Sequence, residues 1–318
     1  MQPKGIGLEE ADSVEITVLM DNYIDLLMPS SEVARQPTLG DTVGEKQSRL
    51  IAEHGFSALV TVIADGRRES ILFDAGLSPD GVLHNIDILE TPLSDVRAIV
   101  LSHGHADHTG ALGGLLRQLA KRGLPLIAHP DAFLQRKVVL PDGREVKLPP
   151  LDRGALLQEG VELVESKEPS LLLDNRALVT GQVARTTEFE KGFPIHHALV
   201  DGRWQPDPSI YDDQALVFNV RGKGLTILTG CGHAGVINIV RHARNVTKIE
   251  NVYALIGGFH LSGPLFEAII PQTVEELKAA APRAVVPAHC TGWKAVHEIA
   301  RAMPDAFIQN SVGTRYVL

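Results

Sequence analysis

The sequence has few cysteines, no long apolar run and no excess of positive charge. Its 318 residues include only two cysteines, Cys231 and Cys290, which argues against a disulfide framework and favours a reducing, cytoplasmic location. No stretch approaches about 18 consecutive apolar residues, so we expect no membrane partner. The net charge of −9 gives no electrostatic footprint for nucleic acid. Residues 1–13 are polar and acidic, and we therefore expect no secretory signal.

The overall composition, 44% hydrophobic and 22% charged, is that of a globular protein with a large core. No internal linker or repeat is evident, so we expect one domain over 1–318 with surface excursions at 29–48 and 135–150. The first excursion lacks hydrophobic periodicity and is a candidate lid. A Pro-Asp-Gly turn in the second predicts a protruding hairpin. The stretch 186–201 is expected to be irregular. The sequence is compatible with a homo-oligomer and does not decide the matter.

The most informative stretch places three histidines and an aspartate within six consecutive positions, in the pattern H-x-H-x-D-H. These residues are His103, His105, Asp107 and His108. They follow the apolar run 97–101, which predicts a buried strand, and precede a predicted helix over 110–120. In extended chain, residues two apart point the same way, so His103 and His105 can hold one cation while Asp107 and His108 turn toward a neighbouring position.

The ligand types indicate which metal this loop would hold. Imidazole favours zinc, iron or copper, and a neighbouring carboxylate adds manganese. We therefore expect two divalent metal ions, zinc first, with iron or manganese as alternatives. Surface histidines in a glycine-rich loop are the simpler interpretation. Four ligand-type side chains rarely coincide at this spacing by chance, which disfavours it.

This pattern after an apolar strand resembles the signature of the metallo-β-lactamase superfamily. The resemblance implies an α/β (α+β) fold, an αββα sandwich of two mixed β-sheets flanked by helices, with a binuclear metal centre at one edge of the sheets. Asp65-Gly66 between apolar runs predicts a β-hairpin, and its second strand ends at Asp74. In the superfamily such an aspartate supports the metal loop by accepting hydrogen bonds. A simple turn before glycine is the alternative for Asp74.

Ligand-type side chains also follow three later predicted strands. They are Cys231 and His233 after strand 225–229, His260 after strand 251–256, and His289 after strand 284–286. The resemblance implies that His289 is the last metal ligand. It also places Cys231 where relatives have an aspartate that bridges the metals; Cys231 would coordinate as a thiolate or merely line the site, and His233 is the competing ligand.

The third histidine of the first metal is the weakest part of this assignment. Relatives place it between the first motif and the next strand, but no Gly-His-Thr motif appears in this chain. The stretch 186–201 holds His196 and His197 without such a motif. His260 is then the natural substitute. For both His260 and His289, a buried histidine without a metal is the alternative.

Upstream, Asp21-Asn22 and His54-Gly55 resemble one branch of the superfamily, the metal-dependent hydrolases that include the dihydropterin-ribofuranosylaminobenzene 5′-phosphate synthase-like proteins. Asp21-Asn22 lies near the site or forms a simple turn, and His54 is a substrate-side or a surface histidine. The resemblance covers nearly the whole chain. It implies the fold and the metal chemistry well, but the reaction and substrate poorly.

We expect a hydrolase that directs metal-activated water at a small molecule, with phosphorylated and pterin-like compounds as candidates. Asp107 would orient the hydroxide, and His233 or Asp213 would transfer protons or contact substrate. A transferase of the methanopterin type is the alternative. A non-hydrolytic metal or redox protein is the second alternative; a di-iron oxygen reductase is disfavoured within it because no glycine-rich flavin segment is visible.

Overall fold

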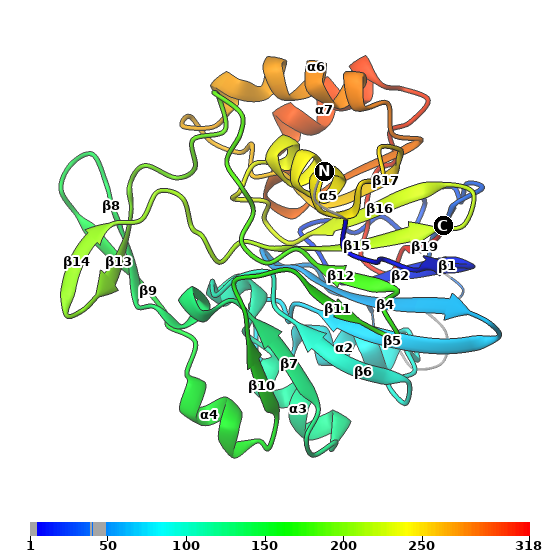
Figure 1. Cartoon of the computed structure of the whole chain (residues 1–318), viewed down its shortest axis with the longest axis horizontal. Coiled ribbons are helices and arrows are strands. Elements are labelled where there is room, and N and C mark those ends of the chain that lie inside the picture. The colour runs from blue at the N-terminus through cyan, green and yellow to red at the C-terminus, as the bar shows by residue number, and fades with distance from the viewer. Residues whose placement is uncertain (1–4, 39, 41–48) are drawn as a thin grey trace.

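The computed structural model describes residues 5–38, 40 and 49–318. Two large β-sheets lie face to face in the middle of the molecule (Figure 1). The first has the order β10 (Glu162–Glu165), β7 (Pro125–Ala128), β6 (Val96–Val100), β5 (Arg67–Phe73), β4 (Ser57–Ala64), β2 (Ser13–Met20), β19 (Arg315–Val317) and β3 (Ala34–Arg35). The second has the order β11 (Ser170–Leu172), β12 (Ala177–Val179), β15 (Ala215–Val220), β16 (Gly224–Thr229), β17 (Val252–Gly258) and β18 (Ala284–Ala288), with β1 (Glu10–Ala11) beside β15.

Both sheets are mixed. In the first, β4 pairs antiparallel with β2 and β5, whereas β5, β6, β7 and β10 run parallel. In the second, β15 and β16 form an antiparallel hairpin, and β16, β17 and β18 run parallel. The carboxyl ends of parallel strands meet at one edge of a sheet, so the loops after β16, β17 and β18 are brought together there.

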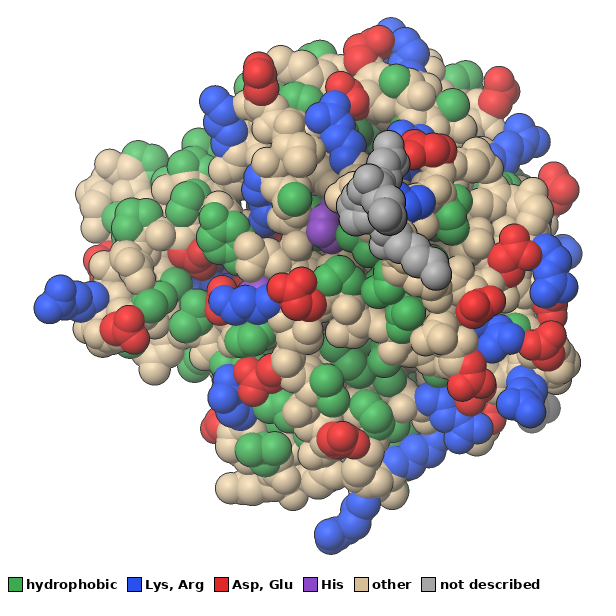
Figure 2. Space-filling model, in the orientation of Figure 1, with side chains coloured by type: hydrophobic (Ala, Val, Ile, Leu, Met, Phe, Trp, Pro, Cys, Tyr) green, Lys and Arg blue, Asp and Glu red, His purple; other side chains and the backbone are tan. Residues whose placement is uncertain are grey.

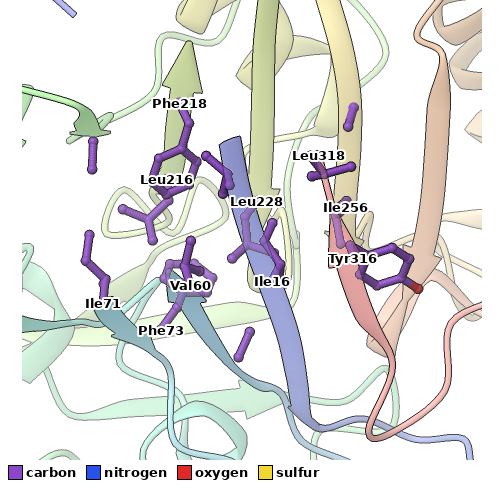
Figure 3. Packing of buried hydrophobic residues seen from close by; sticks show 14 of the residues in the cluster. Ile16, Val60, Ile71, Phe73, Leu216, Phe218, Leu228, Ile256, Tyr316 and Leu318 are labelled. Carbon is purple, nitrogen blue, oxygen red and sulfur yellow. The ribbon is translucent and has the colours of Figure 1, made fainter. Parts of the chain in front are cut away.

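The core between the sheets follows from the alternation of side chains along each strand. On β4, Val60 faces the second sheet, while its neighbour Leu59 packs toward the helices on the other side. On β16, Leu228 joins the core between the sheets and Ile227 faces the opposite helical layer. Figure 3 shows these inter-sheet side chains, Phe73 among them, converging between the strands.

Helices cover the outer face of each sheet (Figure 1). The first sheet is covered by α2 (Gly81–Ile88) and α3 (Leu112–Leu119), and the second by α5 (Val236–Thr247), α6 (Ile270–Ala280) and α7 (Trp293–Ala302). The short α4 (Arg153–Gln158) precedes β10. This αββα arrangement is the predicted fold class. Among the helices of the described ranges, none combines the length and apolar character that a membrane crossing requires.

A third, four-stranded sheet projects from one side of the sandwich, and we call it the side sheet (Figures 1 and 2). Its order is β14 (Arg203–Pro206), β13 (His196–Val200), β8 (Arg136–Val139) and β9 (Glu145–Leu148). The hairpin expected at 135–150 is β8 and β9. The expectation of irregular chain over 186–201 is wrong for β13, because its pairing with β8 depends on a segment far away in the sequence.

The excursion expected at 29–48 lies partly outside the described residues, since 39 and 41–48 are not among them. Its described part includes β3, which pairs antiparallel with β19 at the end of the first sheet. Residues 34 and 35 therefore belong to the first sheet, and the lid stays a prediction.

Candidate metal centre

The ligand-type side chains gather at the edge where β6 of one sheet and β16, β17 and β18 of the other end. They form three overlapping groups, and within each group the candidate ligand atoms lie within 4.8 Å of one another. The groups are His103, His105 and His233; Asp107, His108, Cys231 and His289; and Cys231, His233 and His260. A histidine side chain reaches the surface near the middle of the face in Figure 2.

The first group consists of histidines in a buried environment. His103 Nε2 lies 3.0 Å from His105 Nδ1. Burial lowers the pKa of His105 to about 3 and the pKa values of His103 and His233 well below their usual range. These rings are therefore neutral at physiological pH, and each offers a nitrogen lone pair.

His233 is the clearest sign that this group fits a cation. Its side chain is buried, and neither ring nitrogen has a hydrogen-bond partner. A buried polar group without a partner is costly, and coordination of a cation would satisfy such a nitrogen. The first group thus has three neutral imidazoles close together. His260, the substitute expected for the third histidine, groups with Cys231 and His233 instead of with His103 and His105.

Asp107 and His108 dominate the charge of the second group. His108 Nδ1 lies 2.7 Å from Asp74 Oδ2, and its Nε2 lies 3.2 Å from Cys231 Sγ. Burial would lower the pKa of His108, but the carboxylates of Asp74 and Asp107 raise it to about 9. Burial likewise opposes the charge of Asp107, yet His108 and His289 lower its pKa below the usual range. The position therefore stabilises positive charge, as a metal site requires.

Cys231 completes this group from the turn after β16. Burial raises the pKa of the Cys231 thiol well above its usual value, so the thiol stays protonated unless a cation stabilises the thiolate. Because Cys231 lies against His108, a metal held there would be within reach of sulfur as well as nitrogen and oxygen.

Asp74 holds both ends of the loop 102–108, which carries the first four candidate ligands. Its carboxylate is fully buried and accepts hydrogen bonds from the backbone N–H and the hydroxyl of Ser102, each at 2.7 Å, and from His108 Nδ1. The backbone of Gly230 passes so close that a Cβ there would lie 2.1 Å from Ser102 Oγ. Only glycine fits at this approach of the two sheets. Asp74 therefore fixes which nitrogen of His108 faces the second group.

Asp21 and Asn22 hold the last histidine. Asp21 Oδ1 accepts a hydrogen bond of 2.7 Å from the backbone N–H of His289, and Asn310 Nδ2 donates to Asp21 Oδ2 at 2.6 Å. Asn22 Oδ1 lies 3.2 Å from His289 Nδ1. The polar pair after β2 thus lies at the site and orients the His289 ring, which leaves Nε2 at 3.3 Å from Asp107 Oδ2.

The substrate-side candidates lie in different surroundings. His54 is largely exposed, with Nε2 3.8 Å from Asp107 Oδ2 and its ring 4.9 Å from that of His289. Asp213, by contrast, is buried beneath the turn after β16, where Oδ2 accepts a hydrogen bond from the backbone N–H of Ala234. Burial raises the pKa of Asp213 to about 6. Its place is therefore under the site and not on its open side.

Four residues at the site carry no role in the sequence interpretation: Ser102, Arg136, His196 and Asp212. Arg136 from β8 donates to both oxygens of Asp212, whose Oδ2 also accepts from the backbone N–H of Gly104. The chain offers no local pattern for this contact, because its partners come from distant segments. His196 was visible as a histidine but lacked any motif that assigned it to the site.

Comparisons with known proteins give a consistent result. Residues 55–237 match the family described as the metallo-beta-lactamase superfamily. The 7,8-dihydropterin-6-methyl-4-(β-D-ribofuranosyl)-aminobenzene-5′-phosphate synthase of Methanocaldococcus jannaschii is 32% identical over 265 residues, covering 81% of this chain and 87% of the relative. An uncharacterized protein of the same organism is 31% identical over 266 residues, 83% of this chain and 93% of that protein.

Among solved structures, a protein described as a metal-dependent hydrolase of the β-lactamase superfamily superposes with a TM-score of 0.69 at 23% identity, covering 95% of this chain and 98% of that one. At this identity the likeness supports the fold alone.

Proposed function

The chain belongs to the metallo-β-lactamase superfamily, and from this premise we propose that it is a metal-dependent hydrolase of a small molecule. Two divalent ions, zinc in the first instance and iron or manganese as alternatives, would be held by the two groups of ligands. His103, His105 and His233 would hold one ion. The other would be held by Asp107, His108, Cys231 and His289.

The observation that carries this proposal is a cluster of buried ligand atoms in which the three imidazoles of the first group are neutral and offer lone pairs. Ser102 Oγ donates its proton to Asp74, so it accepts from His103 Nδ1 at 2.9 Å. This leaves a lone pair on His103 Nε2. Lone pairs that converge as in the first group repel one another unless a cation lies between them. In the second group, His108 Nε2 lies against Cys231 Sγ, and the carboxylates of Asp74 and Asp107 stabilise positive charge beside it.

Bound divalent ions would supply Lewis acidity and a water molecule of lowered pKa. Asp107 is the partly exposed carboxylate at this point, and its lowered pKa keeps it ionised at neutral pH. It can therefore accept a hydrogen bond from an attacking water and orient it. His54 lies next to Asp107 on the solvent side, where it can contact substrate or pass a proton to solvent.

The size of the neighbouring cavity favours a small substrate. A cavity of about 290 Å³ opens at His233 and His260, with Phe189, Leu261 and Phe266 among its walls. Small-molecule sites are apolar pockets that contain a few polar groups. The histidines at one end and the apolar side chains at the other would fix a compound with a polar reacting group and an apolar or aromatic portion. Phosphorylated and pterin-like compounds remain the candidates.

A second candidate is the synthase reaction of the M. jannaschii relative, a transferase activity. It is favoured by 32% identity over 81% of this chain. Cys231 also favours it. At the turn after β16 the resemblance expects an aspartate that bridges the metals, and a thiol there distinguishes this site from a carboxylate-bridged hydrolytic centre. Under this alternative the same ligands would bind the same ions, and the difference would lie in the nucleophile.

The experiment that separates the two candidates follows oxygen from solvent. The zinc-, iron- and manganese-loaded enzyme is incubated in ¹⁸O-water with phosphoesters and lactones. In a separate reaction it is given an aminobenzene ribonucleotide and a dihydropterin that carries a phosphate or pyrophosphate as its leaving group. Incorporation of ¹⁸O into product supports hydrolysis, and a joined product without ¹⁸O supports transfer. Asp107→Asn should abolish either turnover. His297→Asn, on α7, is the matched control and should retain it. Turnover unaffected by Asp107→Asn would refute the proposed site.

A further inference from the structure

The side sheet reaches the metal centre through one buried histidine. His196, the first residue of β13, has a fully buried side chain, and its Nε2 lies 3.0 Å from His105 Nε2. The two rings are 5.1 Å apart between centroids. His196 is not a member of any of the three candidate ligand groups formed by the described residues. His196 therefore contacts the candidate ligand His105 but is not itself a candidate ligand.

The hydrogen bonds of His196 determine which of its nitrogens carries the proton. Its Nδ1 lies 3.1 Å from the carbonyl oxygen of Asp207. A carbonyl oxygen only accepts, so Nδ1 is the donor, and a neutral imidazole then has an accepting Nε2. Across the 3.0 Å contact His105 Nε2 must therefore be the donor. This leaves the lone pair of His105 on Nδ1, the atom that faces His103 Nε2.

We propose that His196 is a positioning residue for the first metal: it fixes the tautomer and ring orientation of His105 so that Nδ1 points at the ion. Metal-binding histidines are usually held by a carboxylate or a carbonyl oxygen through their second nitrogen. Here an imidazole supplied by the side sheet takes that place, and the Asp207 carbonyl fixes the imidazole in turn. The inference rests on the proposed metal centre and adds a function for the side sheet.

A second contact from the side sheet holds the same loop. Arg136 on β8 is buried and donates to both oxygens of Asp212, at 3.0 and 2.5 Å. Asp212 Oδ2 accepts from the backbone N–H of Gly104 at 2.9 Å. Because Gly104 lies between His103 and His105, the side sheet restrains the backbone of the loop and the ring of His105 together.

The test measures metal affinity and needs no substrate. Zinc binding is followed by competition with a chromophoric chelator, and cobalt binding by its visible absorption, for the wild type, His196→Phe and His196→Gln. We expect His196→Phe to weaken zinc binding about 10–100-fold and to change the cobalt spectrum, because no acceptor remains for His105 Nε2. His196→Gln offers an amide oxygen as acceptor and should recover most of the affinity.

His197→Phe is the matched control, because adjacent residues on a strand face opposite sides and the half-buried His197 ring hydrogen-bonds to the Ile195 carbonyl oxygen in its own segment. It should bind zinc like the wild type. Unchanged affinity in folded His196→Phe would overturn the inference while leaving the proposed function intact. Complete loss of one metal in both His196 variants, as in His105→Ala, would make His196 a ligand and overturn it also. A wild type that binds no zinc would refute the proposed function itself.

Discussion

Asp74→Asn should weaken the hydrogen bonds that hold Ser102 and His108, because it replaces the carboxylate with a neutral amide of nearly the same shape. In the protein, Asp74 accepts three hydrogen bonds of 2.7 Å, two from Ser102 and one from His108. Asparagine keeps one oxygen for His108 and the Ser102 hydroxyl, but its NH₂ group then opposes the Ser102 backbone N–H. The lost bond costs about 2 kcal/mol and the loss of charge about 1 kcal/mol at each remaining bond. We therefore expect the free energy of unfolding to fall by about 4 kcal/mol.

The assay is urea unfolding in the presence of a chelator, which separates the fold from metal binding, followed by zinc titration of the folded variant. Because the neutral amide oxygen binds His108 Nδ1 more weakly than the carboxylate does, the ring is held less firmly and zinc affinity should fall about 10–100-fold. Asp65→Asn is the matched control: Asp65 also has a positive φ, of 51° against 59° for Asp74, but its carboxylate is exposed and pairs with Arg176. That variant should change stability by less than about 1 kcal/mol. Equal urea midpoints for Asp74→Asn and the wild type would refute the reasoning.

Three further outcomes are expected. The pKa of His108 is raised from 6.5 to about 9. In protein kept metal-free by a chelator, its contribution to the free energy of unfolding, about 3 kcal/mol, is therefore complete below pH 6.5 and lost as the pH rises through 9. Urea unfolding at pH values on either side of this window measures the contribution, and a stability that does not change with pH would contradict it. Phe73→Ala should cost about 3–5 kcal/mol, against less than about 0.5 kcal/mol for the exposed Leu27→Ala, by the same assay. Cys231→Ser should remove the sulfur-to-metal absorption of the cobalt-loaded protein, and Cys290→Ser should retain it; an unchanged spectrum in Cys231→Ser would show that this thiol only lines the site.

The fold was largely predictable because its strands carry local signals. The Asp65-Gly66 turn between two apolar runs gives the β4–β5 hairpin, and the strand before His103 is present as β6. Strand β13 was not predictable. It is short and contains two histidines, and its partner β8 lies in another part of the chain. Such pairing is decided by tertiary packing and not by local propensity.

For the candidate site, the loops were identifiable and the contacts between them were not. Cys231, His233, His260 and His289 each follow a strand, and the parallel order of β16, β17 and β18 brings these ends together. That His233 groups with His103 and His105 depends on the distance between the two sheets, which no motif encodes. Arg136 likewise pairs with Asp207 and Asp212, which lie far away in the sequence, and such ion pairs have no sequence signature.

The central claim is that two sets of ligands in one loop cluster hold two metal ions. Elemental analysis of purified protein, repeated after chelation and reloading with zinc, tests it in the wild type, His103→Ala and Asp107→Ala. We predict about two equivalents of zinc, iron or manganese in the wild type, with loss of metal in each variant and preserved folding by circular dichroism. A folded wild type that retains no metal after reloading would contradict the account.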